Sequence, residues 1–269
     1  MPGTSASDSS TPDAPRHQTT DAPVPPLTRD GAWTWRVAEV PAERLPLTLH
    51  VAHGQMTVGT SLDLIVPRSG SADRLIALLI GAGFAVPSRP EPRPDGSVHV
   101  TVERMRTLAD TAGPSMRMLV CGINPSIYSA DAGVGYARPG NRFWPAATAA
   151  GLVTVDRDPV AALAAGMGMT DFAKRATRTA AEVTRDEYQA GFDRVTRLVE
   201  WLQPGVVCFV GLSGWRTVVD RKATSGVQPE AIGGRPAYVM PSTSGLNART
   251  PPAELSRHLT HAWDLGGSD

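Results

Sequence analysis

The 269-residue chain is poor in cysteine, with only Cys121 and Cys208, each inside an apolar run. A zinc site would require CxxC or Cys/His spacing, which neither cysteine has. Buried free cysteines behave as small apolar side chains. We therefore expect two buried free thiols, without a disulfide or a metal site.

The chain also lacks an excess of charge of either sign, because Lys plus Arg and Asp plus Glu each number 26. Proteins that coat nucleic acid bind mainly by neutralising phosphates with Lys and Arg, so a net charge of zero argues against such a role. Contact with a few phosphates around one nucleotide is compatible with this balance. Any binding to DNA is therefore expected to be local.

Long apolar runs are absent as well. No run approaches the about 18 residues of a membrane span, and the N-terminus lacks the basic-then-apolar order of a signal peptide. We therefore expect a cytoplasmic protein without a membrane partner. No cluster of ligating residues is visible in the sequence, so we expect neither a metal nor an organic cofactor.

Composition divides the chain into three parts. Residues 1–30 are rich in Pro, Ser, Thr and Asp and have almost no large apolar side chains, which predicts a disordered tail. Residues 31–106 predict a small α+β module of unknown role. Its expected elements are strands around 47–51, 62–66 and 98–102, a helix at 71–84 and an exposed loop at 87–95. The remaining residues, 107–269, form the third part.

Strands and helices alternate in this third part. Expected strands are residues 116–121, 206–210 and 237–240, and expected helices are residues 141–152, 184–203, 212–220 and 252–263. The alternation predicts a three-layer α/β/α sandwich with a short, mainly parallel central sheet. In such folds ligands bind beyond the carboxyl ends of the strands, so the residues after each strand are the candidates for chemistry.

Small and polar residues follow the first and third of these strands. Residues 122–126 read GINPS, and a glycine-rich stretch at 133–144 comes soon after. Asn-Pro after a strand is by itself a turn signal, but small residues also let the backbone approach a ligand. Residues 240–249 read MPSTSGLNAR and hold one isolated Leu, which alone usually has no function.

Several motifs, in this order, resemble the mismatch-specific branch of the uracil-DNA glycosylase superfamily. They are GINPS, YARPGNRFW, GMTDFAKRATRTAAEV followed by DEYQAG, and MPSTSGLNAR. That branch comprises the bacterial mismatch-specific enzymes and the eukaryotic thymine-DNA glycosylases. The resemblance covers residues 107–263 and implies a monomeric, cofactor-free DNA glycosylase. Such an enzyme flips a mispaired or damaged pyrimidine out of double-stranded DNA and hydrolyses its N-glycosidic bond.

The resemblance assigns to Asn124 the positioning of the hydrolytic water beneath C1′ of the sugar. Since an amide is not a strong base, cleavage is expected to be largely dissociative, with water captured by an oxocarbenium-like sugar. Backbone N–H groups near Ile123 would stabilise the departing base anion. Tyr136 matches the aromatic on which the flipped base stacks, with a core aromatic as the alternative. Gly122 and Ser129 complete the expected base pocket.

Gly245, Leu246 and Asn247 match the loop that wedges into the duplex and fills the vacancy left by the flipped nucleotide. The loop is one residue longer than in the bacterial type member, so the wedge itself is open among Leu246, Asn247 and Ala248. Arg249 is expected to hold a nearby phosphate.

Basic residues cluster near these motifs, at Arg138, Arg142, Lys174, Arg175 and Arg178. Solvated surface charge is the ordinary interpretation of each. Two or three of them are expected to contact phosphates, and Arg142 and Lys174 are our candidates.

Asp171 stands where relatives often have Lys or Asn. A carboxylate at this position would assist the water as a base or stabilise the cationic sugar, which would compensate for the weak basicity of Asn124. Alternatively, Asp171 caps the turn that follows it. The sequence does not decide between a catalytic residue and a cap.

Two other functions stay open. A uracil-only glycosylase would need a bulky side chain against C5 of the pyrimidine to exclude the thymine methyl, and Tyr128 is the candidate. A catalytically silent nucleic-acid binder on the same fold is the second alternative, but the presence of Asn124 favours catalysis.

Overall fold

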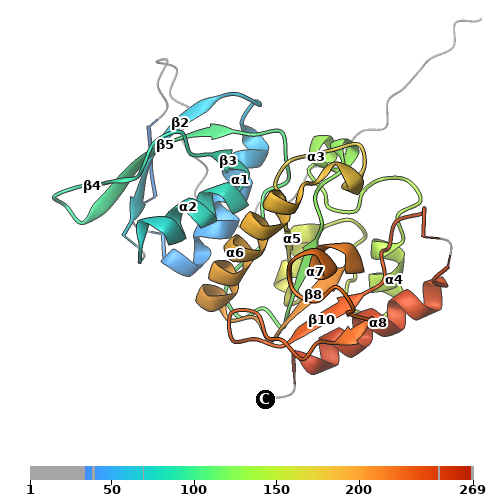
Figure 1. Ribbon diagram of the computed structural model, residues 1–269. Coiled ribbons are helices and arrows are strands. Elements are labelled where there is room, and N and C mark those ends of the chain that lie inside the picture. Colours follow the sequence, from blue (N-terminus) through green and yellow to red (C-terminus); the bar gives the residue numbers. More distant parts are fainter. Residues whose placement is uncertain (1–33, 38–39, 69, 248, 268–269) are drawn as a thin grey trace, which may run out of the picture.

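The computed structural model describes residues 34–37, 40–68, 70–247 and 249–267. The tail predicted at residues 1–30 lies outside this described part. Figure 1 shows two sheets side by side, one in the N-terminal module and one in the larger C-terminal part. Among the described residues, no helix has both the length and the apolar character needed to cross a membrane.

The larger part is built on a five-stranded sheet of order β7-β6-β8-β10-β9. The strands are β6 (Met118–Gly122), β7 (Met167–Asp171), β8 (Val206–Val210), β9 (Gly226–Val227) and β10 (Ala237–Met240). All neighbours are parallel except β9, which runs antiparallel to β10. Because Gly122 and Asp171 are register partners at the ends of β6 and β7, the two loops that follow leave the sheet together.

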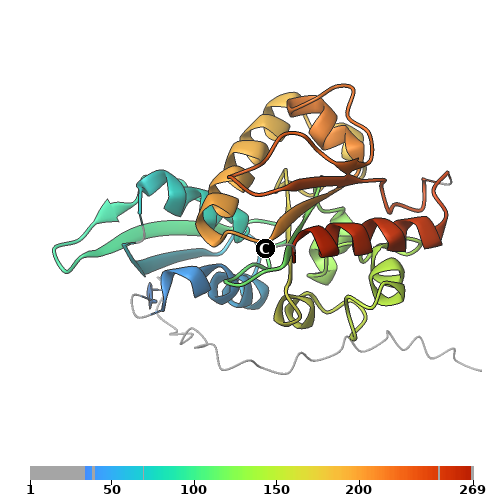
Figure 2. The ribbon, with the colours of Figure 1, turned by 90° about the horizontal axis from the view of Figure 1, so that it is seen from below.

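Helices cover both faces of this sheet (Figure 2). On one face lie α6 (Arg185–Leu202) and α7 (Leu212–Val218). On the other lie α4 (Phe143–Ala149), α5 (Pro159–Ala164) and α8 (Pro252–Leu265), while α3 (Ile127–Ala132) follows β6. This arrangement confirms the predicted α/β/α sandwich.

Local sequence signals explain several of these helices. Thr184 and Glu187 form the expected capping box, and α6 then buries Tyr188, Val195 and Leu198 against the sheet. Pro252 occupies the first position of α8, where a missing N–H costs nothing. The two thiols of Cys121 and Cys208 are free and buried in β6 and β8, as predicted.

The N-terminal module has a second five-stranded sheet and its own core. Its strands are β1 (Thr34–Arg36), β2 (Ser61–Pro67), β3 (Phe84–Ala85), β4 (Glu91–Pro92) and β5 (Ser97–Arg104). A short 3-10 helix, η1 (Ala42–Arg44), leads into α1 (Leu45–Gln55), and α2 (Ala72–Gly81) follows β2. The predicted strands at 62–66 and 98–102 and the helix at 71–84 are confirmed.

The local structure departs from the sequence-based expectation in three places. The alternating apolar residues at 47–51 belong to helix α1, whose buried face is instead set by Leu45, Leu49 and Ala52. The expected exposed loop at 87–95 is confirmed except for the two residues of β4, which pair with β5 across the turn at Gly96. The sequence interpretation also omitted β7, the strand that carries Asp171.

Candidate active site

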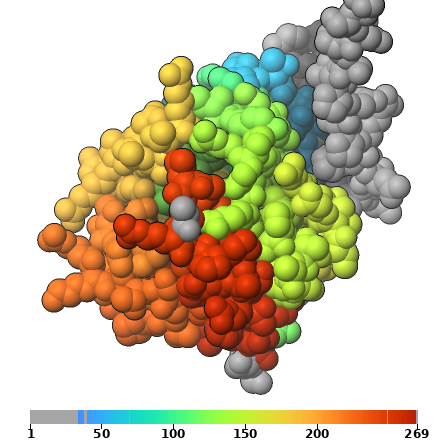
Figure 3. All heavy atoms as spheres, turned by 90° about the vertical axis from the view of Figure 1, so that its right-hand side faces the viewer, coloured from blue at the N-terminus to red at the C-terminus, as the bar shows by residue number. Residues whose placement is uncertain are grey.

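A cavity of about 840 Å³ opens at the carboxyl ends of the central strands. Its walls come from the segments after β6, β7, β8 and β10, which are far apart in the sequence. In Figure 3 it is the hollow between the green segment after β6, the yellow segment after β7 and the red segment after β10. The cavity therefore lies where ligands bind in open parallel sheets.

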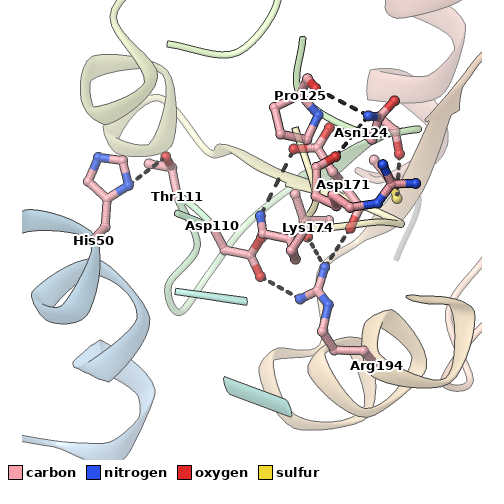
Figure 4. A network of polar contacts seen from close by, with 12 residues as sticks. His50, Asp110, Thr111, Asn124, Pro125, Asp171, Lys174 and Arg194 are labelled. Atoms are coloured by element: carbon pink, nitrogen blue, oxygen red, sulfur yellow. Dashed lines mark hydrogen bonds and ion pairs between the residues drawn. The ribbon is translucent and has the colours of Figure 1, made fainter. Parts of the chain in front are cut away.

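Asn124 lines this cavity, and its side chain is fixed in one orientation (Figure 4). The side-chain nitrogen donates to the Thr177 hydroxyl at 2.7 Å, to the Arg175 carbonyl at 2.9 Å and to the Pro125 carbonyl at 3.2 Å. All three partners are acceptors, so they select the amide nitrogen for this side. The carboxamide oxygen accepts no hydrogen bond from the described residues and is free to hold a water molecule.

Asp171 ends β7 and lies on the same cavity wall as Gly122. A Cβ on Gly122 would overlap the Asp171 carboxylate and lie 3.0 Å from the Tyr136 hydroxyl, so only glycine leaves room for both groups. Burial raises the pKa of the Asp171 carboxyl to about 6, although Lys174 opposes this shift. Its carboxylate accepts no backbone N–H from the described residues, so the alternative of a turn cap is wrong.

A buried charge network lies behind Asp171 (Figure 4). Asp110 accepts from Lys174 Nζ at 2.7 Å, from Arg194 Nη1 at 2.7 Å and from the Thr170 hydroxyl at 2.7 Å. Burial alone would raise the pKa of Asp110, but Arg194 and Lys174 outweigh it and hold the pKa below its ordinary value. Lys174 Nζ lies 4.0 Å from the Asp171 carboxylate and so links the network to the cavity.

This network corrects the prediction that Lys174 contacts DNA. Its side chain is only 4% exposed and is paired with Asp110. A buried ammonium already bonded to a carboxylate cannot reach a phosphate on the surface. The DNA-contact prediction for Lys174 is therefore wrong.

The other predicted base-pocket residues also line the cavity. They are Gly122, Ile123, Ser129 and Tyr136. The Tyr136 ring stacks on Phe143 with centroids 4.2 Å apart, so a base could stack only on its opposite face. Tyr136 therefore supports the Phe143 helix and lines the cavity at once. Its buried hydroxyl has no hydrogen-bond partner among the described residues, and burial, together with Asp171, raises its pKa well above the ordinary value.

The loop after β10 presents Leu246 at the cavity mouth. Leu246 is 86% exposed, the largest exposure among the exposed large apolar side chains of the described chain. Asn247 turns inward instead, and its side-chain nitrogen donates to the Ser242 carbonyl at 2.8 Å. Ala248 lies outside the described residues. Among the described wedge candidates, Leu246 alone has its side chain free to enter a duplex.

Arg142 holds this loop in place through hydrogen bonds to its backbone. It donates to the carbonyls of Thr250 at 2.7 Å, Ser244 at 3.4 Å and Asn247. Gly245 packs against the Gly140 backbone, which a Cβ would approach to 2.8 Å. The predicted phosphate contact of Arg142 is therefore wrong, because its guanidinium donates hydrogen bonds to the loop carbonyls instead.

Other arginines surround the mouth. Arg138, Arg178 and Arg249 line the cavity, are exposed and form no ion pair within the described part of the chain. Arg175, by contrast, is paired with Glu187 at 2.7 Å. Arg249 therefore lies where a phosphate contact was expected, while Arg138 and Arg178, and not Arg142 and Lys174, are the other free cationic groups at the mouth.

Tyr128, the candidate for excluding thymine, is not part of the cavity wall. Its side chain is 51% exposed on α3 and does not line the cavity, whose wall here consists of Ser126, Ser129 and Gly133. The proposed role of Tyr128 is therefore wrong. No group of three His, Cys, Asp or Glu side chains in the described chain is arranged to hold a metal.

Three residues of the site were missed by the sequence interpretation: His50, Asp110 and Thr177. Thr177 lies inside a motif that the resemblance used, but its role is visible only through its contact with Asn124. Asp110 and His50 precede the motifs, and no local pattern in the sequence marks them.

The fold and this cavity agree with a comparison to known families. A family model described as the uracil DNA glycosylase superfamily matches residues 110–265. The match begins at Asp110 and includes all of the central sheet and the predicted catalytic and DNA-binding residues, while the N-terminal module lies outside it. The chain belongs to the uracil DNA glycosylase superfamily and has the DNA glycosylase fold and activity class of that superfamily.

Proposed function

We propose that this glycosylase excises uracil mispaired with guanine in double-stranded DNA, and that it also accepts thymine in the same context. The observation that carries the proposal is the fixed Asn124 amide, whose oxygen is free beside a cavity large enough for an extrahelical pyrimidine. This orientation is the one required to hold a water by its hydrogen.

The residues that line the cavity support the following reaction. The bond between C1′ and the base nitrogen breaks, and its electron pair leaves with the base as an anion. Water held by Asn124 then bonds to C1′, and its proton passes to the Asp171 carboxylate. Because the pKa of Asp171 is about 6, this carboxylate is largely ionised at neutral pH and is still a stronger base than an ordinary aspartate.

The lysines favour simple hydrolysis over covalent amine chemistry. The chain has only two, Lys174 and Lys222. Lys174 is buried in an ion pair, and Lys222 does not line the cavity. Neither amine is available to attack C1′, which supports a monofunctional glycosylase.

Mismatch preference is attributed to the Leu246 loop. Unstacking a nucleotide costs a few kcal/mol and costs least at a mismatch, and an inserted apolar side chain offsets part of that cost. The small wall formed by Ser126, Ser129 and Gly133 supports acceptance of the thymine methyl, since none of these side chains is bulky.

The test is a panel of single-turnover assays on duplexes with G:U, G:T and A:U pairs and on single-stranded uracil DNA. We expect excision in the order G:U, then G:T, then A:U, with Asn124→Ala inactive on all four but still binding the G:U duplex. Equal rates on A:U and G:U would refute the mismatch preference. Wild-type rates in Asn124→Ala would refute the assigned chemistry.

A further inference from the structure

The N-terminal module, which the family match leaves out, is in direct contact with the machinery of the cavity. Helix α2 of the module packs against α6 of the glycosylase part. Trp201 of α6 is packed against the apolar cores on both sides of this junction. The module is therefore joined to the catalytic part by a packed interface.

Gly81, the last residue of α2, is where the module meets the charge network. Its carbonyl accepts from the Asp110 backbone N–H at 2.8 Å. A Cβ at Gly81 would overlap the Asp110 carboxylate and lie 2.6 Å from Arg194 Nη1. The module thus covers the ion pair so closely that only glycine fits at this position.

The covered ion pair is connected to the cavity through Asp171. Asp110 is shared by Lys174 and Arg194, each within 2.7 Å. Lys174 then faces the Asp171 carboxylate, while Arg194 Nη2 donates to the Asp171 carbonyl at 2.5 Å. Both cations therefore contact Asp171 on one side and Asp110 on the other.

The module also supplies part of the cavity wall. His50 of α1 lines the cavity, and its Nδ1 lies 3.3 Å from the Thr111 hydroxyl (Figure 4). Thr111 pairs with Met169 of β7 through two backbone hydrogen bonds of 2.8 and 2.9 Å. A second chain of contacts thus joins the module to the strand that ends at Asp171.

We propose that the N-terminal module is a positioning part of the active site: through Gly81 it seats Asp110 between Lys174 and Arg194, and so fixes the charge state and placement of Asp171. This inference deepens the proposed function and rests on Asp171 acting in the reaction. Asp110, Lys174, Arg194 and Gly81 act through Asp171 and are positioning residues.

The charges around Asp171 determine the direction in which its pKa should change when one of them is removed. The groups that face it are Lys174 beyond β7, Asp110 in the linking segment, Arg194 on α6, Tyr136 in the glycine-rich loop and Cys121 on β6. Asp110→Asn leaves both cations without their shared anion and should lower the pKa of Asp171. Lys174→Met removes a cation and should raise it.

The test measures this pKa in the full chain by ¹³C NMR of labelled aspartate carboxyls, with Asp171→Asn identifying the signal. We expect shifts of roughly 1 unit, downward in Asp110→Asn and upward in Lys174→Met. The acid limb of the single-turnover excision profile should move in the same two directions. A merely structural role would give no shift or shifts of one sign, and either result overturns the proposal.

Gly81→Ala tests the contribution of the module itself. The added Cβ meets the ends of flexible side chains and not backbone, so the fold should be kept while Asp110 moves off Arg194. We expect the pKa of Asp171 to fall and excision to slow at least fivefold. Gly54→Ala in α1 is the matched control, because a Cβ there meets no atom within 4 Å, and it should behave as wild type.

If Gly81→Ala melts before it can be assayed, Ile80→Ala in the same helix replaces it. Ile80 borders the groove that also contacts Lys174 and Arg194, so truncation opens the network to water. Unchanged Asp171 titration and excision in the folded α2 variant would overturn the proposal. Because NMR needs no substrate, absence of wild-type excision would refute the proposed function separately from this inference.

Discussion

The side-chain nitrogen of Asn124 lies 2.7 Å from the hydroxyl oxygen of Thr177, which in turn donates to the Thr179 carbonyl at 2.7 Å. Thr177 itself is buried. Because its hydroxyl hydrogen is committed to Thr179, the oxygen can only accept from Asn124. The Thr177 hydroxyl thus selects the same amide orientation as the carbonyls of Arg175 and Pro125, and it makes the shortest of the three hydrogen bonds.

We therefore predict that Thr177→Val slows single-turnover excision by roughly 10- to 100-fold, the range expected when a reacting group is misplaced by about 1 Å. Without the hydroxyl, the Asn124 amide loses the shortest of the three hydrogen bonds that hold its orientation. Thr177→Ser keeps the hydroxyl and should retain most of the activity. Loss of activity in Thr177→Ser with activity retained in Thr177→Val would show that packing by the Thr methyl matters, and not the hydrogen bond.

Asp171→Asn should slow excision from a G:U duplex more than tenfold at neutral pH and should remove the acid limb of the rate profile. In the wild type the pKa of Asp171 is raised to about 6, so the ionised base is lost as pH falls through that value. Rates measured between pH 5 and pH 8 check this. A wild-type profile with no limb near pH 6 would remove Asp171 from the reaction.

The same variant should be more stable than the wild type at neutral pH. A carboxyl whose pKa rises from 3.8 to about 6 on folding stabilises the protein fully below pH 3.8, and this contribution is lost as pH rises through 6. The difference corresponds to at most about 3 kcal/mol. In urea unfolding, the free energy of unfolding of Asp171→Asn relative to the wild type should increase from pH 4 to pH 6.5. It should not increase further above pH 6.5.

The fold could be predicted from sequence wherever a local signal decides the structure. The capping box at Thr184 and the apolar run of β8 are such signals, and both elements lie where expected. Strand β7 was missed because MGMTD has a glycine and two polar residues in five positions, and its pairing with β6 determines its structure. Helix α1 was misread because Leu47, Leu49 and Val51 recur at every second position, as in a strand. Its buried face is instead set by Leu45, Leu49 and Ala52.

The site residues likewise fall into those that the sequence could identify and those that it could not. Asn124 and the Leu246 loop lie within contiguous motifs, so the resemblance identifies them. The charge network does not, since Asp110 lies 64 residues from Lys174 and 84 residues from Arg194 in the chain. A residue-by-residue interpretation assigns Lys174 to DNA because an isolated lysine is ordinarily exposed. Its burial beside Asp110 becomes visible only in the folded chain.

Leu246→Ala should reduce excision from a G:U duplex roughly tenfold and should leave excision from single-stranded uracil DNA unchanged. The exposed side chain fills the vacancy in the duplex, and a single strand has no vacancy to fill. Thermal stability should not change, because the side chain makes few contacts in the free protein. Val58→Ala, another exposed apolar side chain but in the N-terminal module, is the control and should have no effect on either substrate.

Arg178 and Arg249 should each contribute one phosphate contact at the cavity mouth. Both are exposed and free of ion pairs within the described chain, so replacing either with Ala should reduce the slope of log affinity against log salt by about 1. Binding is measured by fluorescence anisotropy on a G:U duplex in the Asn124→Ala background, which prevents turnover.

Arg89→Ala provides the control for this measurement, since Arg89 is also exposed but belongs to the N-terminal module and does not line the cavity. Its slope should equal that of the parent. If all three variants lower the slope alike, the duplex extends over the module and binding is less local than the charge balance of the chain indicates. If none does, phosphates are held by backbone N–H groups of the loops, and the arginines at the mouth are solvated surface charge.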